Sequence, residues 1–344
     1  LVGVVFVLSP AKLLSGLTGI ETMLLVALIF GYYFLATVVP IHTIIGRIYP
    51  IFGALLLFMT FGIAGGLFLR GYEIIPNQNF FANVHPDGLP LWPLLFIVLS
   101  CGAISGFHST QSPLMARCMK NEANGRFVFY GAMIAEGVIA LIWVTVGLSF
   151  YPSPEAMNSV IAAGSPSAVV NEVSRTLLGP IGGALAILGV IILPITSGDT
   201  AFRSMRLILA ESFELSQREV GKRLLLAVPL FILGYAISLV DFNIIWRYFG
   251  WANQTLAMLG LWAGAIWLVQ HERAKFHWIA SLPAAFMSAV SFTFILYSPI
   301  GLGIPYNVAV VLGLLLALAA LGVFLYKTHG WTTQPTNKLA GGHI

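Results

Sequence analysis

Long apolar segments alternate with short polar ones along the whole chain. A helix needs about 20 apolar residues to cross a membrane, and most of the apolar segments reach that length. We expect helices at 20–38, 48–69, 91–121, 126–150, 179–214, 220–240, 250–270, 276–296 and 305–326. The pattern predicts an all-α, polytopic membrane helix bundle with about nine full spans and one partial span.

The partial span is Leu1–Leu8, which is apolar but too short to cross a membrane. It is followed by a short loop with Lys12, and residues 40–47 are expected to form a turn. The chain starts without a methionine or a basic leader. We therefore expect residues 1–344 to be a single transmembrane domain from the C-terminal part of a longer protein, whose N-terminal helices are partners of this domain.

Basic residues fall mainly on one side of this map. When the loops are assigned alternately to the two sides, 13 of the 17 Lys and Arg residues share one side. Cytoplasmic loops carry such an excess. The prediction is that 70–90 and 151–178 are external loops, with an amphipathic helix near Val169–Leu178, and that 327–344 is a cytoplasmic tail.

Composition supports membrane insertion and excludes several functions. The chain is 58% hydrophobic and 9% charged, whereas soluble domains average about 25% charged residues. A net charge of +4 on one side of a membrane does not indicate nucleic-acid binding. Cys101 and Cys118 suggest free thiols. With no zinc, nucleophile or phosphate-binding motif, we expect no enzyme activity, catalytic residue, metal or cofactor.

Residues 100–113 interrupt an apolar segment with small and polar residues. Gly102 and Gly106 weaken a helix interior, as does Pro113. In lipid, a broken backbone survives only where protein or a wet cavity satisfies its polar groups, so a broken helix indicates a transporter binding site. The alternatives are that Gly102-x-x-x-Gly106 is a packing motif and that Pro113 begins a new helix.

Candidate substrate contacts follow from this interruption. His108 can bind an anion, relay a proton or bond to backbone carbonyls. Small polar groups surround it, and two amides in a later span join them, although helix-to-helix hydrogen bonding is the alternative for those amides. The candidate substrate-binding set is Ser105, Gly106, His108, Ser109, Thr110, Asn253 and Gln254.

Glu136 is a candidate proton carrier. It lies ten residues past Arg126, or about 15 Å along a helix, which is near the bilayer midplane. A charge there costs about 2.5–3.5 kcal/mol or more. The alternative is a structural hydrogen bond to a neighbouring helix.

A second polar cluster follows Pro194 in the seventh expected span. Thr196, Ser197, Asp199 and Thr200 supply oxygen atoms that suit a coupling ion. Asp199 is about 28 Å from Gly179 along a continuous helix, close to the cytoplasmic edge. It can therefore alternatively be the N-cap of a basic helix at 202–213.

Two motifs resemble the carbon starvation protein CstA family. The first is Cys101 to His108, followed by Lys120-Asn121-Glu122, Tyr130 to Met133 and Glu136; the second is Phe249 to Ala257. Thr200 to Arg206 is similar to a family helix with Thr and Arg. The family pattern differs at Ser109 to Pro113 and near Asp199.

This resemblance implies a bacterial inner-membrane secondary transporter. Its substrates would be peptides or a small carboxylate such as pyruvate, taken up during nutrient limitation with coupling to protons. It also implies an inverted-repeat fold similar to amino acid–polyamine–organocation carriers, with 100–113 as an unwound helix. The alternatives are a nutrient-responsive membrane sensor without transport and, third, a membrane enzyme.

Overall fold

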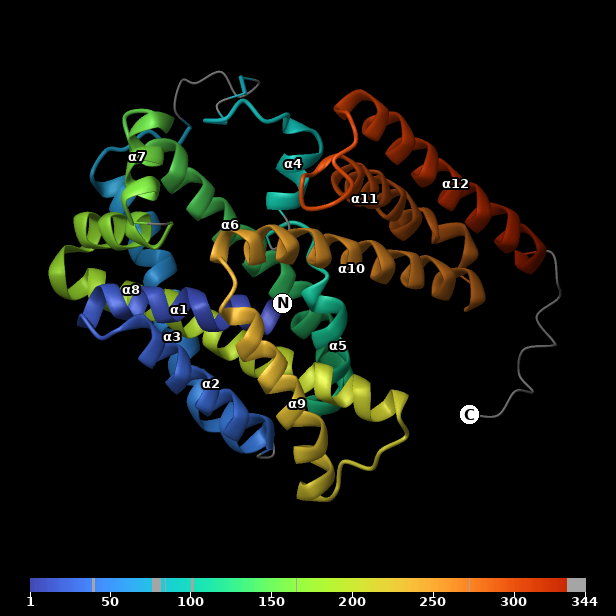
Figure 1. The fold of residues 1–344 in the computed structure, drawn as a ribbon, viewed down its shortest axis with the longest axis horizontal. Helices are drawn as coiled ribbons and strands as arrows, with labels where there is room; N and C mark the ends of the chain where they lie inside the picture. Colours follow the sequence, from blue (N-terminus) through green and yellow to red (C-terminus); the bar gives the residue numbers. More distant parts are fainter. Residues whose placement is uncertain are drawn as a thin grey trace. The chain divides into compact units, whose positions relative to one another are not determined.

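The computed structural model describes residues 1–38, 41–75, 82–83, 85–99, 102–164, 166–271 and 273–332. Within these ranges the chain forms twelve α-helices and no strand. Figure 1 shows the helices in chain order by colour. The all-α prediction is therefore confirmed for the part of the chain that is described.

The helices account for most of the described residues. Two short helical turns, Glu122–Asn124 and Ala274–Phe276, and a π-helix at Arg126–Gly131 lie between them. The α-helices are α1 (Val2–Thr18), α2 (Thr22–Val38), α3 (Ile41–Leu69), α4 (Leu91–Val98), α5 (Phe107–Cys118), α6 (Ala132–Ser149), α7 (Pro154–Gly164), α8 (Pro166–Ser212), α9 (Val220–Ser238), α10 (Phe242–Gln270), α11 (Trp278–Tyr297) and α12 (Tyr306–Thr332).

Seven helical segments of the described chain are long and apolar enough to cross a membrane, which makes this a multi-pass membrane protein. The expected count of about nine is higher because two expected spans differ: α2 has 17 residues, and 91–121 is divided between α4 and α5. The seven segments are Tyr49–Leu69, Glu122–Ser149, Pro166–Ser212, Val220–Ser238, Phe242–Gln270, Trp278–Tyr297 and Tyr306–Thr328.

Several expected connections are helical instead. The first helix does not stop at Leu8, and Lys12 lies inside α1. The turn expected at 40–47 is wrong because α3 begins at Ile41. The connection expected between the spans 220–240 and 250–270 is mostly helical, because α10 begins at Phe242 and includes Arg247. A basic side chain is tolerated near a helix end because its long stem carries the charge toward water.

Two of the segments expected to be loops also contain helix. Residues 151–178 include α7 and the first part of α8, which covers the amphipathic helix expected at Val169–Leu178. The tail was expected from 327, but α12 continues to Thr332, and 333–344 lie outside the described residues. The side of the membrane on which each segment lies stays a prediction.

The helices divide into two compact units. Unit 1 consists of Leu1–Leu89 and Thr110–Phe249, and unit 2 of Pro90–Ser109 and Gly250–Ile344. One boundary precedes α4, and the other two fall inside α5 and α10. A single transmembrane domain stays a prediction.

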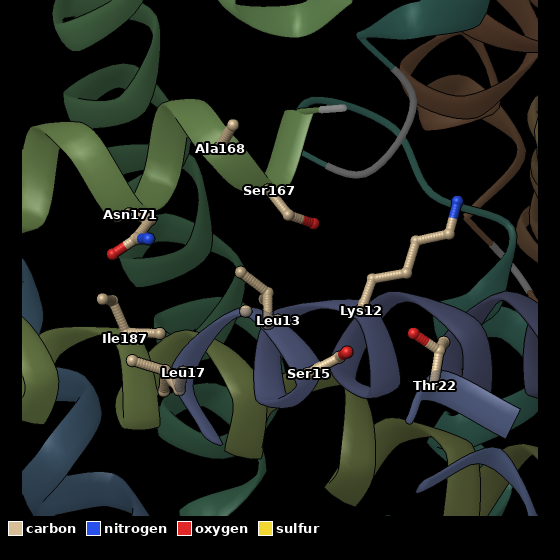
Figure 2. A pocket seen from close by; sticks show the side chains of 10 residues that line it. Lys12, Leu13, Ser15, Leu17, Thr22, Ser167, Ala168, Asn171 and Ile187 are labelled. Atoms are coloured by element: carbon tan, nitrogen blue, oxygen red, sulfur yellow. The ribbon is translucent and has the colours of Figure 1, made fainter. Parts of the chain in front are cut away.

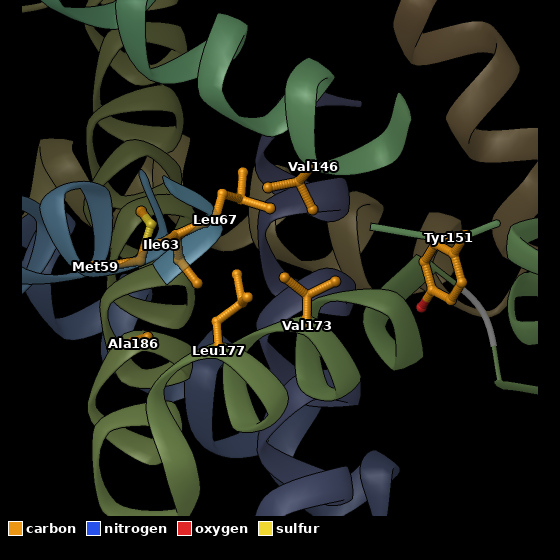
Figure 3. Close-up of a cluster of buried hydrophobic side chains, with 8 residues drawn as sticks. All are labelled: Met59, Ile63, Leu67, Val146, Tyr151, Val173, Leu177 and Ala186. Carbon is orange, nitrogen blue, oxygen red and sulfur yellow. The ribbon is translucent and has the colours of Figure 1, made fainter. Parts of the chain in front are cut away.

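Unit 1 is built around α8. Both α1 and α3 pack along this helix. One of its apolar clusters joins α3, α6 and α8 (Figure 3), and Met59, Ile63 and Val173 have almost no exposed surface. Gly179 bends α8 with φ 74° and ψ −176°, a backbone conformation that is almost restricted to glycine.

Tyr33 joins three helices of unit 1. Its hydroxyl oxygen lies 2.8 Å from the Phe6 carbonyl oxygen of α1 and 3.1 Å from the Pro194 carbonyl oxygen of α8. Pro10 has no N–H to donate to the carbonyl four residues earlier, so Tyr33 supplies a donor that the helix lacks. A Cβ at Gly198 would lie 2.2 Å from the same hydroxyl.

In unit 2, α11 packs against α12 and α4. A row of hydroxyl groups follows the side of α11 that contacts α10. Trp262 Nε1 donates to Ser288 Oγ (3.0 Å), and Thr255 Oγ1 and Ser291 Oγ are 2.6 Å apart. These bonds satisfy polar groups that would otherwise be costly to bury.

Candidate functional site

The interruption predicted at 100–113 is present in part, because residues 107–113 are helical. Helix α4 ends at Val98 and α5 begins at Phe107. The described residues between them, Leu99 and 102–106, form turns or irregular backbone, while Ser100 and Cys101 lie outside the described residues. Pro113 lies inside α5, so the alternative in which it begins a helix is wrong. We call 99–106 the helix break.

Two amide side chains of α10 bond to the backbone on either side of the break. Asn253 Oδ1 accepts a hydrogen bond from the Phe107 N–H (2.9 Å), and Gln254 Nε2 donates to the Phe96 carbonyl (2.7 Å). Asn253 is 2% exposed and Gln254 1%. Helix ends leave backbone groups without intrahelical partners, and these amides satisfy one such group at each end of the break.

Gly106 brings the break into contact with the α10 backbone. A Cβ at this position would lie 2.2 Å from the Asn253 carbonyl oxygen and 2.5 Å from the Ala257 nitrogen. Ser105 Oγ is 3.4 Å from Asn253 Oδ1, and Ser109 Oγ donates to the Gly106 carbonyl (2.6 Å). The sequence therefore needs glycine at 106 because neither helix backbone can move aside.

The polar side chains at the start of α5 are partly accessible. Ser105 and His108 are half-buried and Ser109 is exposed. The His108 ring lies 6.4 Å from the Phe107 ring, centroid to centroid. The site thus combines a neutral or cationic imidazole with hydroxyl groups beside an irregular backbone, which suits hydrogen bonding to a small polar solute.

The rest of α5 belongs to unit 1 and bonds to α8. Gln111 Nε2 donates to Ser204 Oγ (3.2 Å), whose hydroxyl is 3.3 Å from the Thr110 carbonyl oxygen. Sequence analysis did not select Gln111 or Ser204. Their polarity inside a span was the available signal, but only the fold shows that they meet.

Asp199 forms a buried ion pair inside α8. Its Oδ1 lies 3.4 Å from Arg203 Nη2, one helical turn away, and Arg203 also donates to the Ala36 carbonyl. Asp199 is 0% exposed, and its Oδ2 has no hydrogen-bond partner among the described residues. The N-cap alternative is wrong because α8 continues through Asp199 to Ser212.

The hydroxyl groups around Asp199 bond within their own helix. Thr196 Oγ1 donates to the Leu193 carbonyl (2.9 Å), and Thr200 Oγ1 to the Ser197 carbonyl (3.0 Å). Ser197 is half-buried. Helix α8 continues through Pro194 and Gly198, and serine and threonine inside a helix commonly bond to carbonyls of the preceding turn.

Glu136 is half-buried in the first turns of α6. The π-helix at Arg126–Gly131 directly precedes α6, and such segments are frequent at functional sites. Within the described residues, no three His, Cys, Asp or Glu side chains are grouped to hold a metal ion.

The structure distributes the candidate residues between the two units. Ser105, Gly106, His108, Ser109, Asn253 and Gln254 belong to unit 2, whereas Thr110, Glu136, Thr196, Ser197, Asp199 and Thr200 belong to unit 1. Direct hydrogen bonds join Asn253 to Ser105 and to the Phe107 backbone. A role in substrate binding or ion coupling stays a prediction for every member.

The model of one protein family matches most of the chain. The model of the family "Carbon starvation protein CstA" matches residues 5–176 and 155–294. The two matches together cover most of the 344 residues. The chain therefore belongs to the carbon starvation protein CstA family.

Individual relatives include named transporters. An "Uncharacterized membrane protein" of Haemophilus influenzae is 44% identical over 48% of this chain and 58% of its own length. The "Peptide transporter CstA" of Escherichia coli is 25% identical over 80% of this chain and 49% of its own length. The "Pyruvate/proton symporter BtsT" of the same organism is 36% identical over 37% of this chain and 18% of its own length.

The chain thus spans about half the length of the curated peptide transporter it matches. No solved structure matches the chain.

Proposed function

We propose that the chain is the part of a secondary transporter that contains the broken helix of the substrate path. The observation that carries this proposal is the break at 99–106, which lies in an otherwise apolar segment and is held by buried amides of α10. A broken helix exposes backbone groups that can bind a solute. The names of the relatives support transport as the activity.

The proposed substrate is a peptide or a short carboxylate such as pyruvate. Ser105, His108, Ser109 and Thr110 are the proposed polar contacts. Gly106, also in the predicted set, places them by packing against the α10 backbone. Asn253 and Gln254, also in the predicted set, bond to the backbone on both sides of the break. Their proposed role in substrate binding is therefore indirect: they hold the backbone of the break in the conformation that contacts the substrate.

The proposed coupling ion is a proton. Glu136 is a half-buried acid inside an apolar helix, and ionisable side chains within membrane spans are frequent in proton pathways. Thr196, Ser197, Asp199 and Thr200 form the second polar cluster of this proposal.

The proposed setting is the bacterial inner membrane, with a cytoplasmic C-terminus and activity during nutrient limitation. The chain works there within a longer polypeptide whose N-terminal helices complete an inverted-repeat fold. The 13-to-4 distribution of basic residues supports the orientation. The longer polypeptide is supported by the peptide transporter of Escherichia coli, of which the match covers 49% of the length.

Uptake by the full-length protein tests the proposal. Labelled pyruvate and a labelled dipeptide are supplied to membrane vesicles with and without an inward proton gradient. We expect accumulation that requires the gradient, and its loss in His108→Ala and Glu136→Gln. Lys222→Met, on an exposed surface pair, is the control and should transport normally.

Three results would count against parts of the proposal. If both variants keep the uptake and pH dependence of the natural protein, the assignment of the site is wrong. If labelled solute never accumulates, the sensor interpretation replaces transport. If accumulation ignores the proton gradient, the coupling ion is different.

A further inference from the structure

A cavity of about 400 Å³ lies in unit 1, and none of the candidate substrate or ion-coupling residues lines it. Figure 2 shows its walls, which come from α1, the first residue of α2 and two parts of α8. It is therefore formed within one compact unit. Its volume falls in the range of small-molecule sites, about 300–1,000 Å³.

One wall of the cavity is apolar. Leu13 and Ile187 belong to a buried apolar cluster, and Leu17 packs against it. Side chains of this kind favour an apolar part of a ligand, since each buried CH₂ group contributes about 0.8 kcal/mol.

The other walls carry one positive charge and several neutral polar groups. Among the described residues that line the cavity, Lys12 is the one with a charge, and Thr22, Ser167 and Asn171 add two hydroxyl groups and an amide. The Ser15 hydroxyl also lines the cavity but already donates to the Ile20 carbonyl (2.7 Å). Asn171 Oδ1 accepts from Arg175 Nε (2.7 Å), so its NH₂ group is the part that remains to donate. Together these groups provide one cation and several hydrogen-bond donors.

The Lys12 ammonium is not neutralised by a described carboxylate. Its Nζ lies 4.1 Å from the centre of the Phe242 ring, an attractive contact that leaves the charge in place. Glu21, next to the lining residue Thr22, is exposed and forms no ion pair with Lys12 among the described residues. Two other acids bond to different groups. Glu172 accepts a hydrogen bond from the Tyr151 hydroxyl (3.0 Å), and Asp241 accepts from the Asn243 N–H at the start of α10 (2.9 Å).

We infer that this cavity binds a small molecule with one carboxylate and an apolar side chain, such as the C-terminal residue of a short peptide. The carboxylate lies at Lys12 and the apolar side chain at Leu13, Leu17 and Ile187. A single ammonium suits a monoanion, whereas phosphate groups usually require an arginine fork or several cations. A metal cation is disfavoured by the same ammonium.

This pocket is distinct from the helix break, whose polar contacts involve no residue of the cavity wall. The predicted orientation has the connection between α1 and α2, close to this pocket, on the external side. The pocket is then a first binding site on the outer side of the transporter. The inference depends on the proposed function for the class of substrate, while its test measures binding without transport.

Equilibrium binding to the purified full-length protein in detergent tests the inference. The probe is tritiated alanyl-leucine, and the competitor is its C-terminal amide, which has the same side chains but no carboxylate. We expect the amide to compete poorly. We expect Lys12→Met to weaken binding by about tenfold, as for the loss of a charge-assisted contact, whereas Lys222→Met binds normally.

Other outcomes would overturn the inference. Equal competition by the amide, unchanged binding in Lys12→Met, or no binding to the natural protein would each do so. Displacement of the dipeptide by short-chain phosphatidylglycerol, but not by free leucine, would assign the pocket to a lipid headgroup instead. Vesicle uptake that persists in any of these cases would leave the proposed transport function standing.

Discussion

Gly106 and Asn253 determine the local form of the helix break. The glycine allows two backbones to approach within a distance that no side chain tolerates, and the asparagine replaces a missing intrahelical acceptor. Both effects depend on single atoms. Substitutions at these residues therefore test the break more sharply than changes to its flexible polar side chains.

Replacing Gly106 by alanine should destabilise the protein. The new methyl group would meet the Asn253 carbonyl and the Ala257 nitrogen, and overpacking against groups that cannot move costs about 1–3 kcal/mol or more. We expect a lower unfolding temperature in detergent and reduced uptake. Gly264→Ala is the control. Gly264 lies on α10, and a Cβ there would have its nearest neighbour at 4.0 Å, so the change should be neutral or slightly stabilising.

The Asp199–Arg203 pair should show strong coupling. Removing one partner of a buried pair leaves a charge uncompensated and costs about 3–5 kcal/mol. We expect Asp199→Asn and Arg203→Gln each to lower stability strongly, and the double variant to lose less than both losses added together. The exposed Glu219–Lys222 pair should show coupling below about 1 kcal/mol. Additive losses at the buried pair would contradict this account.

At this scale the sequence predicted which residues are unusual but not what they contact. Gly106, His108 and Asp199 are recognisable because small or polar residues are rare in apolar spans. The four-residue spacing of Asp199 and Arg203 also permits an ion pair on one helix face. Gln111 and Ser204 are 93 positions apart, so their contact depends on tertiary packing that no local pattern encodes.

At the scale of the helices, α10 and α11 form a contact with many hydrogen bonds. Lipid provides no water to satisfy a polar group, so the serines on α11 pair with tryptophan and threonine side chains of α10. The same helix α10 also carries the amides that hold the break. A change in the contact between α10 and α11 therefore reaches the break through a single rigid element.

Trp262→Phe tests this contact between helices. The change removes the hydrogen bond to Ser288 Oγ and keeps most of the aromatic surface, so we expect a loss of about 1 kcal/mol. Thermal unfolding in detergent measures it. Trp267→Phe on the same helix is the control, because Trp267 is 50% exposed. An equal effect of both changes would show that the hydrogen bond contributes nothing specific.

Element types were predicted better than element ends. The helical spans could be predicted because the thickness of the hydrocarbon layer sets the length of an apolar helix. The break could be predicted because glycine and polar residues interrupt an apolar segment there. The loops expected around Lys12 and Arg247 are helical. A basic residue between two apolar segments does not by itself indicate a loop, because its long side chain can extend from a helix to water.

At the scale of the whole molecule, the chain changes from one compact unit to the other inside α5 and again inside α10. Each unit has its own buried apolar clusters. The break and the amides that hold it belong to unit 2. Two of the three boundaries fall within helices, where the sequence has no local signal of a division, and the third lies before α4, between Leu89 and Pro90.

The orientation in the membrane can be tested with an existing cysteine. Cys118 is a free, exposed thiol at the end of α5, in the region between Arg117 and Lys120 that the charge count makes cytoplasmic. In a Cys101→Ser background, a membrane-impermeant maleimide should label inside-out vesicles and not intact cells. Labelling of intact cells would reverse the predicted orientation.

Tyr33 has one hydroxyl hydrogen and two carbonyl acceptors, on α1 and on α8. Since a phenol can make only one strong linear hydrogen bond as a donor at a time, the two helices compete for the same proton. A small displacement of α2 that strengthens its link to Phe6 weakens its link to Pro194. The Tyr33 hydroxyl can therefore bond strongly to only one of the two carbonyls at a time, and phenylalanine at this position would remove both hydrogen bonds.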